Sequence, residues 1–167
     1  MKKKVLFFGD MNNILLTVAI GLSKTGLKVR YLPSLKINQH YRFYDLLIPG
    51  IDIKEIIEFE NYDISIFKKD EVDKYKEKLI KFKNDGYIVV GTGLTPSVLE
   101  YCGINLDMFV VSGADLVNQT KENIFKSYLK TLVNIIKGKK NFLSLKKISN
   151  LQFNGILNSK LIVSHSS

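Results

Sequence analysis

Three short apolar runs in this chain end in the same way, and this repetition constrains the fold more than any other feature. The runs are Lys4–Phe8, Tyr87–Val90 and Asp107–Val111, and they lead into "GDMNN", "GTG" and "SGAD". Short apolar runs bounded by glycine are typical of strands that are buried on both faces of a parallel sheet. Because helix-type patterns alternate with these runs, the sequence predicts an α/β fold: a Rossmann-like open parallel sheet with helices on both faces.

The other expected elements follow from apolar spacing and from residues that start or stop helices. Two further strands are predicted, Lys28–Leu32 and Leu161–Val163. Four helices are predicted: one from Ile14 that ends at Gly26, one from Asp70 that ends at Asn84-Asp85-Gly86, a short one capped by Thr95 and closed by Gly103, and a basic one over Asn123–Lys137. The first of these helices is expected to bury Ile14, Leu15, Val18, Ala19 and Leu22.

The segment Leu35–Phe67 has no periodicity that decides between a strand and a loop. The length of 167 residues fits a single domain over residues 1–167.

Positive charge is concentrated at one end of the chain. The formal net charge is +9, and from Lys121 onward there are nine lysines and one acidic residue, Glu122. Such a basic end suggests an anionic partner such as lipid headgroups, phosphate or nucleic acid. Lysine-rich usage that reflects only the composition of an AT-rich genome explains the same bias equally well.

Several chemistries lack the residues that they need. Cys102 is the only cysteine, so it is expected to be a buried inert thiol, and no metal site is predicted. The sequence "GTGLTP" has Pro96 where a dinucleotide fingerprint has its third glycine, and Thr92 stands where a P-loop has lysine. His40 and His165 are expected to be surface residues, and no nucleophile elbow occurs.

Polar residues and glycines gather where the three strands are expected to end. In an open parallel sheet, ligands bind outside the carboxyl ends of the strands, where helix N-termini favour phosphate or sugar oxygens. The sequence therefore predicts a site for an oxygen-rich ligand at this edge, although capping and turn chemistry could explain any single loop. Asp10, Asn12 and Asn13 are expected to project into a cleft there, because three polar groups exceed what one helix cap requires.

Three segments carry a resemblance to a known family. They are "GDMNNILLTVAIGLSKTGLKV", "YIVVGTGLTPSVLEYCGINLDMFVVSGADL" and "ILNSKLIVSHSS". They resemble the N-terminal, acceptor-side lobe of a retaining glycosyltransferase of the two-lobed GT-B type, family 4-like. By this resemblance the residues that line the acceptor cleft are Gly9, Asp10, Asn12, Asn13, Gly91, Thr92, Gly93, Ser112, Gly113 and Asp115. Ser112 stands where that family usually has histidine, and no catalytic residue can be assigned.

The resemblance implies the function and the partners. It implies transfer of a sugar from a nucleotide-sugar to a surface-polysaccharide or lipid-linked acceptor. Because the first apolar run breaks at Gly9-Asp10 with no cleavage site after it, and no stretch is long and apolar enough to span a bilayer, we expect a cytoplasmic protein, which could attach peripherally to the inner face of a membrane through its lysine-rich end. No cofactor is expected, because the nucleotide-sugar would bind the C-terminal donor lobe, which the resemblance places beyond this chain, so the chain alone is expected to be inactive. No nucleic acid partner is implied. The alternatives are a non-catalytic Rossmann-like binding protein and one subunit of a split transferase with a separate donor-lobe chain.

Overall fold

The structure is a computed structural model of the chain, and it describes residues 3–9, 14–32, 58–59, 68–111 and 143–164. The described strands are β1 (Lys4–Phe8), β2 (Lys28–Leu32), β3 (Glu58–Phe59), β4 (Tyr87–Gly91), β5 (Met108–Val111) and β6 (Leu161–Ser164). The described helices are α1 (Ile14–Lys24), α3 (Lys69–Asn84), α4 (Thr95–Cys102) and α7 (Leu145–Leu157).

The strands form one parallel sheet in the order β3-β2-β1-β4-β5-β6. The chain builds outward from β1 to β3, and then crosses back to place β4 on the other side of β1. This order is that of the doubly wound dinucleotide-binding fold, with its topological switch point between β1 and β4. The protein therefore has a Rossmann-like α/β fold.

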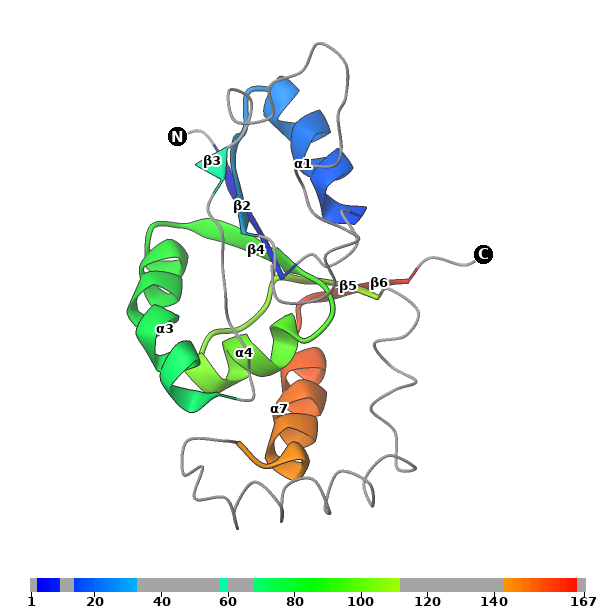
Figure 1. Cartoon of the computed structure of the whole chain (residues 1–167). Coiled ribbons are helices and arrows are strands. Elements are labelled where there is room, and N and C mark those ends of the chain that lie inside the picture. The colour runs from blue at the N-terminus through cyan, green and yellow to red at the C-terminus, as the bar shows by residue number, and fades with distance from the viewer. Residues whose placement is uncertain (1–2, 10–13, 33–57, 60–67, 112–142, 165–167) are drawn as a thin grey trace, which may run out of the picture.

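Helix α1 lies on one face of the sheet, and α3, α4 and α7 lie on the other (Figure 1). Alternate residues of the strands face two apolar cores, one on each side of the sheet. One core joins the sheet to α3, α4 and α7, and its strand residues include Leu6, Phe8, Leu32, Tyr87, Val89 and Phe109. The other joins the sheet to α1, and its strand residues include Val5, Phe7, Val29, Tyr31 and Val90. The helices thus lie on both faces, which confirms the fold class that the apolar runs predict.

Most of the predicted elements in the described ranges are confirmed. The carboxylates Asp70 and Glu71 lie in the first turn of α3, and lysines lie in its last turn, which matches the helix dipole. After α4, Gly103 has φ 74°, the left-handed conformation that ends a helix and that glycine adopts without strain. The predicted basic helix over Asn123–Lys137 lies outside the described residues.

One prediction about a helix is wrong, and another helix is missing from the predictions. Val18 is 49% exposed, whereas Leu16 and Ile20 are buried, so the apolar stripe of α1 is rotated relative to the predicted one. Helix α7 is not predicted at all, although Ser144 caps it by accepting a hydrogen bond from the backbone N–H of Lys147 at 3.2 Å.

Candidate functional site

The switch point brings two of the predicted loops together. In the pairing of β1 with β4, Phe8 lies opposite Gly91, so the chain leaves both strands at the same edge of the sheet. Gly9 follows β1 directly, and Thr92 and Gly93 follow β4. The structure therefore confirms that Gly9 and the "GTG" segment are neighbours. They lie at the carboxyl edge of the switch point, where proteins of this fold class bind their ligands.

The side chain of Thr95 fills the space between these two strand ends. Its hydroxyl oxygen lies 2.9 Å from the carbonyl oxygen of Phe8 and 2.6 Å from that of Thr92, so one O–H group serves both acceptors. A Cβ atom added to Gly9 or to Gly91 would overlap the Thr95 side chain. The absence of a side chain at these two glycines therefore makes room for Thr95, whereas the sequence predicts that it lets a ligand approach the backbone.

Thr95 also does not have the role that the sequence assigns to it. The N-cap residue of α4 is Leu94, and no side chain caps this helix. The Thr95 hydroxyl instead joins the first turn of α4 to the end of β1, across a sequence separation of 87 residues. Because this contact forms only in the tertiary fold, the local sequence pattern cannot reveal it and indicates a helix cap instead.

The "GTG" segment lies inside the protein. Thr92 is 2% exposed, and Gly91 and Gly93 are also buried, whereas Gly9 is half-buried. Gly91, Thr92 and Gly93 therefore expose little surface at this edge, and whether they and Gly9 line the acceptor cleft stays a prediction.

Six predicted site residues lie outside the described residues: Asp10, Asn12, Asn13, Ser112, Gly113 and Asp115. Whether the three polar residues after β1 project into a cleft stays a prediction.

The structure adds one polar residue that the sequence did not indicate. Gln152 of α7 is 2% exposed, and its carboxamide binds the segment after β4. Its Oε1 accepts a hydrogen bond from the backbone N–H of Ser97 at 3.1 Å, and its Nε2 donates to the carbonyl oxygen of Gly93 at 2.9 Å. The available signal was the helical recurrence of Ile148, Leu151, Gly155 and Ile156, which places Gln152 on the buried face.

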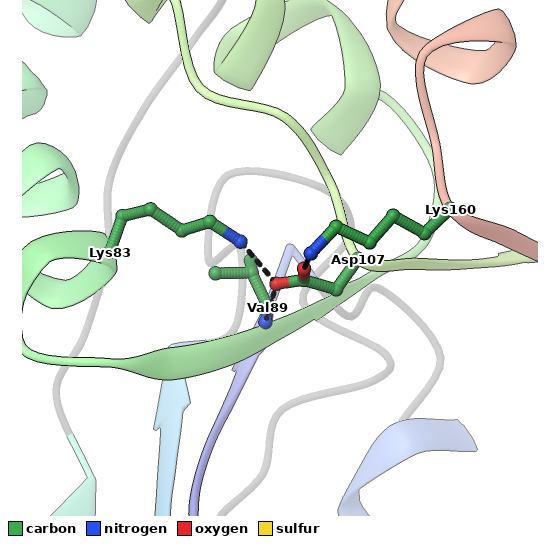
Figure 2. Close-up of polar contacts among 4 residues, drawn as sticks. All are labelled: Lys83, Val89, Asp107 and Lys160. Atoms are coloured by element: carbon green, nitrogen blue, oxygen red, sulfur yellow. Dashed lines mark hydrogen bonds and ion pairs between the residues drawn. The ribbon is translucent and has the colours of Figure 1, made fainter.

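The opposite, amino edge of the sheet carries an ionic cluster (Figure 2). Asp107 precedes β5, and its Oδ2 accepts hydrogen bonds from Lys83 Nζ at 2.5 Å and from the Val89 backbone N–H at 2.8 Å, while its Oδ1 pairs with Lys160 Nζ at 2.8 Å. Burial alone raises the pKa of Asp107, but the hydrogen bonds from Lys160, Lys83 and Val89 outweigh it, and the pKa lies below its ordinary value of 3.8. The cluster joins α3, β4, β5 and β6, so its role is structural.

Reactive side chains are scarce in the described ranges. Burial raises the pKa of the Cys102 thiol to about 11, so the thiol stays protonated at neutral pH, and the expected inert cysteine is confirmed as buried. No group of three or more His, Cys, Asp or Glu residues that could hold a metal occurs among the residues that the structure describes. Over the same residues, no helix has both the length and the apolar character that a membrane span requires.

The residues around β1 and β2 differ from those of a dinucleotide site. That fingerprint needs three spaced glycines after the first strand and an acidic residue about 20 residues further on for the ribose. Here the residues that follow β1 are "GDMNN", which contain one glycine, and β2 ends at the buried Tyr31-Leu32, followed by Pro33. These segments therefore lack the glycine spacing and the acidic residue of that fingerprint.

Comparisons with known proteins do not assign this chain to a family. No family model matches the chain, and no curated protein matches it. A solved structure that aligns with it is a short-chain dehydrogenase/reductase (wide type) from Veillonella parvula DSM 2008 in complex with NADP. The two share 12% identity over 98% of this chain and 68% of that chain, with a TM-score of 0.41, a similarity too weak to carry an argument.

Proposed function

We propose that this chain is the acceptor-side lobe of a glycosyltransferase that moves a sugar from a nucleotide-sugar to a surface-polysaccharide or lipid-linked acceptor. One observation carries the proposal: β1 and β4 are adjacent at the switch point, with Gly9 and the "GTG" segment at the same edge. This is the place where an open α/β sheet binds its ligand. The sugar chemistry comes from the sequence resemblance, which covers both of these segments.

The described residues around the switch point are suited to position an acceptor, and they include no group that could act as an acid or a base near neutral pH. Around the switch point they are glycines, Thr95 and Gln152, none of which titrates near neutral pH. Sugar transfer needs the acceptor hydroxyl and the donor anomeric carbon to be aligned in a cleft that excludes water. A lobe of this kind holds the acceptor, and a second lobe has to bind the donor.

A binding and turnover panel tests the proposal. The probes are methyl glycosides of glucose, galactose, mannose and N-acetylglucosamine, together with UDP-glucose and NADP(H). We expect weak, saturable binding of at least one methyl glycoside, no sugar transfer from UDP-glucose, and no binding of NADP(H).

The outcomes separate the candidate classes. Absence of glycoside binding would leave a non-catalytic Rossmann-like protein, and tight binding of NADP(H) would indicate a dinucleotide enzyme. Sugar transfer by the chain alone would show that the active site has been misplaced. Transfer that appears only when a separate donor-lobe chain is added would identify a split transferase.

We also propose that the lysine-rich end binds anionic lipid headgroups. The exposed Lys146 and Lys147 at the start of α7 belong to this end, and each well-placed lysine contributes about 1 kcal/mol at an anionic surface. Binding to vesicles that contain phosphatidylglycerol should weaken as salt rises, because screening shortens the reach of the charges. Equal binding to neutral and anionic vesicles would contradict this role.

A further inference from the structure

The first turn of α4 already uses its hydrogen-bond donors inside the protein. The Thr95 N–H donates to the carbonyl oxygen of Thr92 at 3.2 Å, and the Val98 N–H donates to that of Leu94 at 3.3 Å. Pro96 has no N–H, and the Ser97 N–H bonds both to the Leu94 carbonyl oxygen and to Gln152 Oε1, each at 3.1 Å. Anions bind at helix N-termini through N–H groups that point at the ligand, and this turn presents none.

The packing of α7 closes the same turn sterically. Gly155 is buried, and a Cβ atom added to it would overlap the backbone carbonyl of Pro96. The backbone of α7 therefore lies directly on the first turn of α4. No ligand group can enter between the two helices at this point.

Gln152 connects these features to the strand end. Its carboxamide spans from Ser97 in α4 to Gly93 in the segment after β4, with both of its polar atoms bonded and the side chain 2% exposed. A buried amide without partners costs free energy, so these two bonds hold both segments in one geometry. The carboxamide carries no charge, and this geometry is independent of pH.

We infer that Gln152 is a positioning residue for the proposed acceptor site: it fixes the Gly91–Leu94 segment from inside the protein and closes the N-terminus of α4 to anions. The inference rests on the proposed function and narrows it. On the α4 side, the site takes the neutral hydroxyl groups of the acceptor, and any phosphate of the acceptor lies away from α4.

The test compares two variants on the same helix. Gln152→Met keeps the length of the side chain and removes both bonds, and Asn154→Met replaces an exposed amide by the same side chain. In Gln152→Met, amide hydrogen exchange at Ser97 should be about five- to tenfold faster and the affinity for the best-binding methyl glycoside about five- to tenfold weaker. Asn154→Met should change neither. Equal glycoside affinities in the two variants would overturn the positioning role.

A titration of the unaltered protein needs no variant. Inorganic phosphate should leave the amide NMR signals of Ser97 and Val98 unshifted, and a saturable shift of either signal would overturn the inference. If no methyl glycoside binds the unaltered protein, the proposed function fails. The phosphate titration still decides whether the α4 N-terminus is closed to anions, including where Gln152→Met does not fold, and the exchange rate at Ser97 tests the contribution of Gln152 where the variant folds.

Discussion

The segments at the two edges of the sheet are held together by different kinds of contact. At the carboxyl edge, the Thr95 hydroxyl and the Gln152 carboxamide make neutral, buried hydrogen bonds to backbone groups. At the amino edge, Asp107 forms ion pairs with Lys83 and Lys160, and the Lys160 side chain is 70% exposed. One edge is therefore fixed by groups that do not titrate near neutral pH, and the other by charges that reach solvent.

This difference indicates which edge of the sheet is suited to hold a ligand. Ion pairs at a surface are weakened by salt and by changes of pH, whereas buried neutral hydrogen bonds are not. The edge at which we propose ligand binding is the one whose geometry stays constant as conditions change. Substitutions at each edge test whether the two edges differ in this way.

The largest effect is expected at Gly9. Gly9→Ala places a Cβ atom against Thr95 and forces a left-handed φ of 77° on alanine. The φ costs about 1–2 kcal/mol, and the overlap adds about 1–3 kcal/mol, measured as loss of unfolding free energy in urea. Gly26→Ala is the matched control, since Gly26 has φ 81° and open space around it. Equal losses in the two variants would show that Thr95 does not fill the switch point.

A smaller effect is expected at Thr95 itself. Thr95→Val keeps the shape of the side chain and removes the hydroxyl, which leaves the carbonyl oxygens of Phe8 and Thr92 without this donor. The expected loss of unfolding free energy is about 1–3 kcal/mol, and it should be the same at pH 5 and pH 8. Thr95→Ser retains the hydroxyl and serves as the control. A valine variant as stable as the serine variant would contradict the importance of these bonds.

The smallest effect is expected at the ionic edge. Asp107→Asn removes the charge, and the remaining amide oxygen can still accept from the Val89 N–H, so the loss should be about 1 kcal/mol at neutral pH and low salt. Thermal unfolding of both proteins between pH 2 and pH 7 measures it.

The sign of the pH dependence follows from the pKa of Asp107. Its folded-state pKa lies below the ordinary 3.8, so the contribution is fully present above that value and is lost as pH falls through the folded pKa. The stability difference between the unaltered protein and the Asp107→Asn variant should therefore disappear in acid and shrink in high salt. A difference that persists unchanged at the acid end would mean that the ion pairs do not stabilise this edge.

Local patterns in the sequence predict the elements but not the contacts between them. The strands β1, β2, β4 and β5 are predictable because short apolar runs ended by glycine or proline have few alternatives. The adjacency of β1 and β4 follows from the fold class, so the position of Gly9 next to the "GTG" segment is predictable too.

The roles of Thr95 and Gln152 could not be predicted, because they depend on contacts between segments that are far apart in the chain. Thr95 carries a capping signal, yet its hydroxyl reaches Phe8 across 87 residues, and nothing local encodes that distance. Gln152 lies 59 residues from Gly93, in a helix whose apolar stripe is interrupted by this polar residue. The helical recurrence can place Gln152 on the buried face, but nothing in the sequence identifies Gly93 and Ser97 as its partners.

Mapping where a glycoside binds tests the account most directly. The amide NMR signals of the chain are followed as the best-binding methyl glycoside is added. The account predicts saturable shifts at Gly9 and Leu94, on the carboxyl edge, and none at Asp107 or Leu161, on the amino edge. Shifts that gather around Asp107, or no saturable shift at either edge, would contradict the claim that the switch point holds the sugar acceptor.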